Sequence, residues 1–589
     1  MDKIIARISE ELEKAFAAAG YDRKYAVVRN SDRPDLGDFQ CNGAMAAAKE
    51  YHKAPIMIAE DVIAKTAEST VFQSEAVKPG FINIRVAPEA LVSYLREMEE
   101  DEHLSVPQEE HPKKIVIDYG GPNVAKPLHV GHLRSAVIGE SVKRLVRAVG
   151  NEVLGDVHLG DWGLQIGLII TELQERRPEL PYFSEDENAA YPEEAPFTIS
   201  ELEEIYPTAS AKSKEDEAFR DRAMQATHEL QEGRPGYRAL WKKIMEVSVA
   251  DLKRNYHRLS VDFDLWKAES DVQEYIPQIV ADLKDRELAH EDQGALVVDV
   301  SDESDKKQIP PCIILKSDGA ALYATTDIAT IYEREKLFKP DQIIYVVDKR
   351  QSMHFVQVFR TVRKAGYINE STELTHVGFG TMNGKDGKPF KTRDGGVMRL
   401  ENLLNDIEKE MQVKISDNRN VKEEDAAETA KIVSLAALKY GDLSNQASKD
   451  YIFDVDKFTS FEGNTGPYIL YTIVRIKSIL ERAEAKDREA AEKAAALLET
   501  NTAEQRALML SLTQFGSVIE DAYRDLAPHK ICAYIFELSN EFNRFYHETK
   551  ILSEADEAMR RSYLNLLVLT GNVLEKCIDI LGFSSPEHM

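Results

Sequence analysis

The chain has 589 residues, of which 43% are hydrophobic and 30% charged, and its formal charge is −28 at pH 7. This length exceeds what one hydrophobic core supports, so we expect three or four domains. No apolar stretch approaches the ~20 residues of a membrane span, and the acidic charge weakly disfavours nucleic acid, although a local basic track would escape this global sum.

The first residues lead directly into an amphipathic helical pattern with no apolar signal core, so we expect a cytoplasmic protein. The four cysteines are far apart in the sequence and form no Cys-x-x-Cys pair. They are Cys41, Cys312, Cys532 and Cys577. We expect buried thiols, with neither a disulfide framework nor a zinc site.

Residues 1–110 are predicted to form a small α+β module. Two or three helical patterns precede a strand pattern over residues 76–86. The acidic stretch 97–102 and the polar run 107–112 offer no apolar face for packing, which is typical of a linker. The first domain boundary is therefore placed after this linker.

Residues 111–400 are predicted to form an α/β domain with a parallel sheet, because short apolar runs alternate with helical stretches. These runs are residues 115–119, 152–157, 342–347 and 375–379. Ligands of such sheets bind at the carboxyl ends of the strands. An insertion around residues 175–290 interrupts the pattern, and its acidic, Pro-rich part, 175–234, is interpreted either as partly helical or as a disordered loop.

The most informative segment is 122–132, Pro-Asn-Val-Ala-Lys-Pro-Leu-His-Val-Gly-His, which lies between a strand pattern and a helix pattern. A strand end, a glycine turn and a helix start place backbone N–H donors where a polyphosphate can bind. His129 and His132 add side-chain donors, and Gly131 allows close approach to the backbone. Two ordinary histidines near a helix cap are the alternative, which the surrounding pattern and Lys126 disfavour.

Beyond residue 400 the strand patterns end and helical periodicity persists, so residues 401–589 are predicted to be all-α. Within this region, residues 482–500 have strong helix-forming composition. We interpret them as a solvated helix face.

Five motifs occur in order along the whole chain: 121–132, Gly160-Asp161-Trp162-Gly163-x-Gln165, Leu322-Tyr323-x-x-x-Asp327, 461–468 and 542–547. With these motifs the chain resembles the class I aminoacyl-tRNA synthetases, and specifically the arginyl-tRNA synthetases. The resemblance implies a Rossmann-like catalytic domain at 111–400. It also implies an N-terminal tRNA-contacting domain at 1–110 and an anticodon-binding domain at 401–589.

The implied activity is that of an arginine–tRNA ligase, which attaches L-arginine to tRNA(Arg) through an arginyl-adenylate and releases pyrophosphate and AMP. The implied substrates are ATP as its Mg²⁺ complex, L-arginine and tRNA(Arg). No structural zinc is expected, and a monomer is the family expectation.

The resemblance implies a phosphate site in two parts. The expected ATP-binding residues are Pro127, His129, Gly131, His132, Lys388 and Lys391. The family's Lys-Met-Ser-Lys-Ser-like loop is absent in its usual form, and residues 380–396 occupy its place, with Lys388, Lys391 and Arg393 as candidate phosphate clamps. We expect His129, His132, Lys126 and Lys391 to be catalytic, with Lys126 supplying part of the missing loop charge. A charged surface hairpin is the alternative for this loop.

Arginine recognition requires acceptors in the plane of the guanidinium and an aromatic wall. Tyr323 and Asp327 are four residues apart on a predicted helix and hence on one face. A helix-surface pair is the alternative. The full expected set is Asp118, Gly121, Pro122, Asn123, His132, Tyr323, Asp327 and Gln351.

Contacts with tRNA are expected where aromatic, amide and basic residues combine. The candidates are Phe81, Asn83, Tyr468, Tyr471, Arg475, Asn543, Arg544 and Tyr546. Ordinary core or helix packing is the alternative for each of them.

Three other functions compete with this prediction. A cysteinyl or glutamyl enzyme of the same class is the nearest, although zinc-binding residues typical of the cysteinyl type are not evident. A synthetase-like RNA-binding protein is disfavoured by the intact histidine and Tyr323/Asp327 motifs. Another nucleotidylyltransferase is disfavoured by the long helical region.

Overall fold

The computed structural model describes the chain except for residues 34, 187–189, 318, 389–397 and 417–422. The N-terminal module is α+β, as predicted, with an antiparallel sheet in the order β1-β2-β4-β3. Its strands are β1 (Val28–Asn30), β2 (Phe39–Cys41), β3 (Phe72–Val77) and β4 (Phe81–Val86). Its helices are α1 (Ile4–Ala18), α2 (Gly43–Ala47), α3 (Pro55–Ile63) and α4 (Pro88–Glu100).

The predicted parallel sheet is confirmed, with strand order β11-β10-β5-β6. Its strands are β5 (Lys114–Tyr119), β6 (Glu152–Asp156), β10 (Gln342–Asp348) and β11 (Glu373–Phe379). Both faces are covered: α5 (Val130–Ala148) packs on one, while α11 (Tyr323–Phe338) and α12 (Ser352–Ala365) pack on the other. Burial on both faces explains why the strands are apolar at successive positions instead of alternate ones.

The insertion is helical over most of its described length, so the disordered-loop interpretation was wrong. Its helices are α6 (Leu164–Arg176), α7 (Ile199–Glu215), α8 (Glu217–Glu232) and α9 (Pro235–Arg258). Thr198 caps α7 by accepting from the Glu201 N–H at 3.3 Å, and the Glu201 carboxylate accepts from the Thr198 N–H at 2.7 Å. This capping box was a readable sequence signal for helix.

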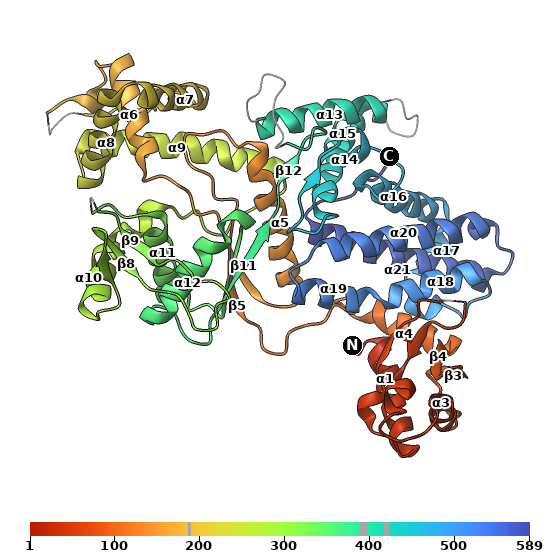
Figure 1. Cartoon of the computed structure of the whole chain (residues 1–589). Helices are drawn as coiled ribbons and strands as arrows, with labels where there is room; N and C mark the ends of the chain where they lie inside the picture. Colours follow the sequence, from red (N-terminus) through yellow and green to blue (C-terminus); the bar gives the residue numbers. More distant parts are fainter. Residues whose placement is uncertain (34, 187–189, 318, 389–397, 417–422) are drawn as a thin grey trace.

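The next segment contains α10 (Ile276–Asp285) and a small antiparallel sheet that the sequence patterns did not reveal. Its strands are β7 (His290–Asp292), β8 (Ala295–Val298) and β9 (Cys312–Leu315). In Figure 1 α6, α7 and α8 lie together above this sheet. All of these elements precede α11 in the chain.

The C-terminal region is helical, as predicted, with one exception. Its helices are α13 (Leu400–Ser416), α14 (Glu423–Leu443), α15 (Val455–Phe458), α16 (Gly466–Arg482), α17 (Ala485–Ala491), α18 (Ala503–Thr513), α19 (Phe515–Arg524), α20 (His529–Glu548) and α21 (Glu557–Leu581). The exception is β13 (Tyr451–Ile452), which pairs in parallel with β12 (Met382–Asn383). A two-residue strand has too short a pattern to be read from sequence.

The interpretation of residues 482–500 as one solvated helix was also wrong. Helix α16 ends at Arg482 and α17 spans only seven residues. The side chain of Asp487 is 1% exposed and pairs with Arg560 at 2.8 Å and with Arg561 at 2.9 Å. Residues 482–500 therefore do not form one continuous helix, and Asp487 packs against α21 instead of facing solvent.

The N-terminal module contacts the helical region, below which it lies in Figure 1. Arg506 of α18 binds Asp38 at 2.6 Å and the carbonyl of Val86 at 2.9 Å. The four cysteines are buried free thiols, as expected. Within the described parts of the chain, no helix combines the length and apolarity needed to cross a membrane.

Candidate active site

The two histidines lie where β5 gives way to α5, and each ring is held by a backbone N–H. His129 is the N-cap of α5, and its Nδ1 accepts from the Gly131 N–H at 3.0 Å. The Nδ1 of His132 accepts from the His129 N–H at 3.2 Å. Because Nδ1 is the acceptor in each ring, the proton of the neutral ring is on Nε2. The turn therefore provides two Nε2–H donors.

Both rings are neutral at physiological pH. Burial, together with the neighbouring His129 and Lys126, lowers the pKa of His132 to about 3. Burial and Lys126 also lower the pKa of His129. The ring centroids are 3.8 Å apart, a spacing that a pair of charged rings would oppose. The donors therefore act as dipoles at the helix N-terminus.

The structure explains the need for glycine at position 131 differently from the prediction. A Cβ at this position would lie 2.7 Å from Cε1 and 2.8 Å from Nδ1 of His129. The capping ring itself therefore requires glycine, whereas the predicted reason was the close approach of a ligand to the backbone.

The predicted phosphate cations are only partly described. Lys126 lies with its Nζ 4.4 Å from the ring centroid of Tyr206, on the insertion helix α7. Lys388 is exposed, and its carbonyl accepts from the Gly384 N–H at 2.8 Å. Lys391 and Arg393 lie outside the described residues. Pro127 is half-buried in the same turn as the histidines.

Asn123 is held beside the histidine turn by the Gly-Asp-Trp-Gly segment. It forms a parallel bridge with Gly160, and the Val124 N–H donates to the Gly160 carbonyl at 2.9 Å. A Cβ on Gly160 would lie 2.1 Å from Asn123 Oδ1. Gly121 is similarly close-packed, since its Cβ would meet the His158 carbonyl oxygen at 2.6 Å. Pro122, which lies between Gly121 and Asn123 in the sequence, is buried.

Tyr323 and Asp327 lie on the first turns of α11, as the four-residue spacing predicted. Tyr323 is 68% exposed and begins the helix. The carboxylate of Asp327 lies 2.5 Å from Nε2 of His354 on α12. Gln351 is exposed one turn before His354. His354 thus joins α11 and α12 at the site, although no sequence motif points to this residue.

Two further carboxylates at this end were missed. Burial and the charge of Asp161 raise the pKa of Glu269 to about 7, with Asp327 adding to the effect. Burial raises the pKa of Asp161 to about 6, and its carboxylate accepts from the Ser270 hydroxyl at 2.7 Å. Asp161 stood inside a recognised motif, whereas Glu269 lies in none. Acids with raised pKa values beside one another favour a bound cation.

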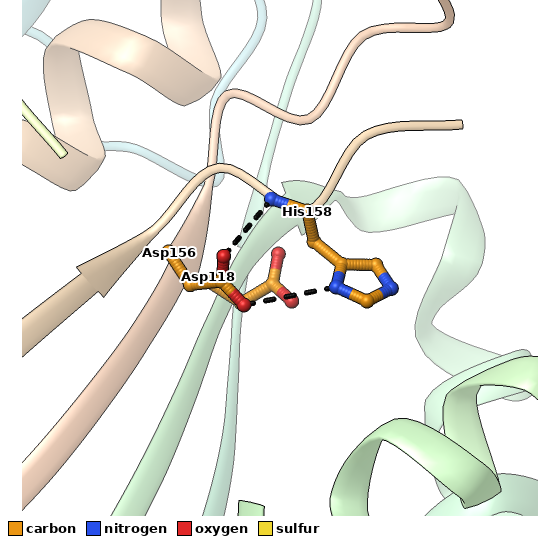
Figure 2. A group of neighbouring side chains, drawn as sticks. All are labelled: Asp118, Asp156 and His158. Atoms are coloured by element: carbon orange, nitrogen blue, oxygen red, sulfur yellow. Dashed lines mark hydrogen bonds and ion pairs between the residues drawn. The ribbon is translucent and has the colours of Figure 1, made fainter. Parts of the chain in front are cut away.

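Asp118 is more constrained than predicted. Its carboxylate and that of Asp156 each lie 2.6 Å from Arg334, whose side chain is 2% exposed. Figure 2 shows Asp118 and Asp156 at the strand ends beside the His158 ring. The Nδ1 of this ring lies 3.6 Å from Asp156 Oδ2. Burial raises the pKa of Asp118 in spite of Arg334 and His158. An arginine ligand would therefore share Asp118 with a guanidinium already in place.

Among the described residues, Asp118, Asp156 and His158 are the one group of His, Cys, Asp or Glu side chains whose ligand atoms lie close enough together to hold a metal ion. Because Arg334 already binds both carboxylates, their negative charge is compensated by the protein. A metal ion would have to displace that guanidinium.

Five of the six candidate tRNA residues in the helical region form one cluster across α16 and α20. The contacts are Asn543 Nδ2 to Tyr468 Oη (2.9 Å), Arg475 Nη1 to Asn543 Oδ1 (2.5 Å), and Arg475 stacked 4.7 Å from Tyr471 and 5.0 Å from Tyr546. Arg544 is separate and pairs with Glu541 at 2.9 Å.

The pair predicted on β4 is placed differently. Asn83 is 4% exposed, and its Oδ1 accepts from Gln40 Nε2 at 3.0 Å. Phe81 is half-buried at the start of the strand. The burial of Asn83 favours the alternative of ordinary packing for this residue, because the neighbouring strand β2 already uses its amide oxygen.

Three family models match: "tRNA synthetases class I (R), catalytic domain" over residues 95–455, "DALR anticodon binding domain" over 469–589 and "Arginyl tRNA synthetase N terminal domain" over 2–86. The arginine–tRNA ligases of Agathobacter rectalis and Alkaliphilus oremlandii are 62% and 54% identical, each over 100% of both chains. The arginyl-tRNA synthetase structures from Plasmodium falciparum and Thermus thermophilus superpose with TM-scores of 0.81 and 0.77. Both are 23% identical and cover 100% and 99% of this chain, with 99% and 100% of their own chains covered.

Proposed function

The chain belongs to the class I arginyl-tRNA synthetases, and on that premise we propose that it attaches L-arginine to tRNA(Arg) at the expense of ATP. The reaction proceeds through an arginyl-adenylate, and it releases pyrophosphate and AMP. The observation that carries this proposal at the site is the pair of neutral imidazoles at the N-terminus of α5.

The histidine pair suits the first chemical step. When the arginine carboxylate attacks the α-phosphorus of ATP, negative charge builds on the phosphoryl oxygens and on the departing pyrophosphate. Donors fixed in advance stabilise this transition state more than the ground state. The Nε2–H groups of His129 and His132 are such donors, because their rings are already oriented by backbone bonds. Neutral rings also donate without a change of protonation state.

The acidic end suits the arginine side chain. Asp327 and Glu269 would accept from the guanidinium, and Tyr323 would pack over its plane. Asn123 and Asp118 would hold the α-amino and carboxylate end, with Gly121, Pro122, His132 and Gln351 completing the expected set. Rejection of lysine follows from geometry, since its single ammonium would leave acceptors unpaired.

ATP enters as its Mg²⁺ complex, and Lys126 with the loop lysines Lys388 and Lys391 would bind the departing pyrophosphate. Residues 1–110 and 401–589 would bind the tRNA around the catalytic domain 111–400. We further propose that the enzyme is monomeric and cytoplasmic and that it contains no structural zinc.

Aminoacylation of total tRNA with each labelled amino acid tests the function. We expect arginine alone to be attached, and ATP–pyrophosphate exchange should be measured with and without tRNA. Attachment of another amino acid, or arginine-independent exchange, would overturn the proposal.

A further inference from the structure

Arg134 is a buried cation where three segments meet. It lies on α5 two residues after His132, and it is 2% exposed. Its Nε donates to Asp442 Oδ1 on α14 at 2.8 Å, and its Nη1 donates to the carbonyls of Gly380 at 2.7 Å and Lys449 at 3.0 Å. One guanidinium therefore connects the histidine helix, α14 and the first residue of the predicted phosphate loop.

The described start of that loop, residues 380–388, is here called the entry limb. It is fixed to the segment 447–456, which follows α14. The bonds are Gly380 N–H to the Ala447 carbonyl (2.9 Å), Thr381 N–H to Asp450 Oδ1 (2.8 Å) and Lys385 Nζ to Asp454 and Asp456 (3.1 Å each). A Cβ on Gly380 would lie 2.6 Å from the Lys449 carbonyl oxygen, so this contact requires glycine.

The far end of the same loop is fixed to the histidine turn instead. The Leu400 N–H donates to the Leu128 carbonyl at 2.8 Å, and the Val130 N–H donates to the Met398 carbonyl at 3.0 Å. The loop thus begins on one anchor, 447–456, and ends on another, the turn that contains His129. Arg134 links these two anchors, because it lies on α5, which begins at the histidine turn, and it bonds to the Lys449 carbonyl in the other anchor.

The helix that carries Asp442 also contacts the candidate tRNA surface. Helix α14 packs against α16, on which Tyr468, Tyr471 and Arg475 lie. Two residues before Asp442, the Tyr440 hydroxyl lies 2.5 Å from Asn464 Oδ1 at the start of α16. It also lies 2.9 Å from the Cys532 carbonyl oxygen on α20. A continuous set of contacts therefore leads from α16 and α20 to the entry limb.

The chemistry of the Arg134 contact favours a geometric role. Replacing a buried ion pair with apolar residues is often neutral or stabilising, so the pair is a weak source of stability. The Arg134 contact is instead suited to orienting its partners, because a planar guanidinium fixes the positions of several acceptors at once.

We propose that Arg134 is a positioning residue that holds the entry limb in register with His132 and makes this register depend on α14 through Asp442. This inference rests on the proposed function, since the register matters only if the loop and the histidines act on one nucleotide. A lysine at this position would keep the charge but lose the fork.

The kinetic test uses ATP–pyrophosphate exchange by Arg134→Lys and Asp442→Asn in the full-length protein. A small misplacement of reacting groups can cost ~10²-fold in rate. We expect a fall in kcat of that order for Arg134→Lys and a smaller one for Asp442→Asn, with the KM for arginine unchanged. The double variant should lose less than the product of the two single losses, because both changes break one contact.

Lys439→Met is the matched control. Lys439 is also a buried basic residue on α14, but it donates to the carbonyls of Ser260 at 3.1 Å and Gly582 at 2.6 Å, away from the entry limb. We expect near-normal exchange kinetics for this variant. An equal loss in Lys439→Met, or an unchanged kcat in Arg134→Lys, would overturn the proposal.

Hydrogen–deuterium exchange tests the positioning without reference to catalysis. The amides of residues 380–388 should exchange faster in Arg134→Lys and Asp442→Asn than in Lys439→Met. Asp442→Asn keeps an oxygen acceptor for Nε and so provides a second variant if Arg134→Lys fails to fold. Unaltered protection of the entry limb would refute the inference even if arginine activation were absent, so the two proposals can fail separately.

Discussion

The two ends of the candidate site differ in how they are built. The ATP end is one local turn in which backbone N–H groups orient two neutral rings, His129 and His132. The arginine end collects Asp161, Glu269 and Asp327 from separate segments, and their burial and proximity raise the pKa of Glu269 to about 7. On the proposed assignment, one end would bind ATP through fixed dipoles, and the other would bind arginine through charge.

This difference has a consequence for function. Fixed dipoles keep their strength across neutral pH, because the lowered pKa values of the histidines keep both rings uncharged. A carboxylate whose pKa is near 7 is stabilised only when a cation arrives. The proposed ATP end is therefore preorganised, whereas the proposed arginine end would be completed by its ligand.

Removal of a dipole should have the largest effect. His132→Ala deletes one Nε2–H donor, and loss of such a donor typically lowers kcat by ~10²–10³-fold. We expect this loss in ATP–pyrophosphate exchange, with the KM for arginine little changed. Circular dichroism should show an intact fold. Near wild-type exchange would contradict the dipole role.

Removal of charge at the other end should appear in binding. Asp327→Asn replaces an anionic acceptor of the guanidinium, and a hydrogen bond to a charged group is worth ~1.5–3 kcal/mol. The KM for arginine should therefore rise by ~10–10²-fold, while the KM for ATP stays the same. His354→Asn is the control, since it removes the partner of Asp327 but leaves the carboxylate. An unchanged arginine KM in Asp327→Asn would remove this residue from the site.

The pH dependence should separate the two ends. Below its raised pKa, Glu269 is protonated and cannot pair with a guanidinium, so the KM for arginine should rise as pH falls through about 7. One pH unit below the pKa corresponds to a change of up to ~10-fold. In Glu269→Gln the KM should be higher and this part of its pH dependence lost. If wild type and variant show the same pH profile, Glu269 does not face the ligand.

The smallest effect should come from Gly131→Ala. The added Cβ would lie 2.7 Å from His129 Cε1, so the capping ring must move from its position. A side chain forced off its rotamer costs ~0.5–1.5 kcal/mol, which corresponds to up to ~10-fold in kcat. The exchange assay measures it, with Gly571→Ala on α21 as a control for substitution of glycine, because a Cβ there would meet only the Ile476 side chain at 3.4 Å. Wild-type kcat in Gly131→Ala would show that the ring position is not critical.

The same difference decides what the sequence could predict. The parallel sheet and the histidine turn were predictable, because a strand, a glycine turn and a helix cap are written in consecutive residues. The shared face of Tyr323 and Asp327 was predictable from their helical spacing, whereas their part in arginine recognition rested also on the family motif.

Glu269 and His354 were not predictable from local patterns. Glu269 lies in a short 3-10 helix. His354 contacts Asp327, but the two residues are 27 positions apart in the sequence and lie on different helices. Arg134 escaped for a related reason, since its partner Asp442 is 308 residues away. A charged residue within an otherwise apolar stretch of α5 was the one available signal for it.

The pairing of β12 with β13 limits where the catalytic part of this enzyme could be joined to the helical region of another protein. A cut at residue 400 would separate the two strands and would leave Arg134 without Asp442 and Lys449. A hybrid with a foreign helical region would therefore need to keep residues 442–456 with the catalytic part. The structural unit that contains the histidine helix and its contacts therefore extends past residue 400, where the α/β pattern of the sequence stops.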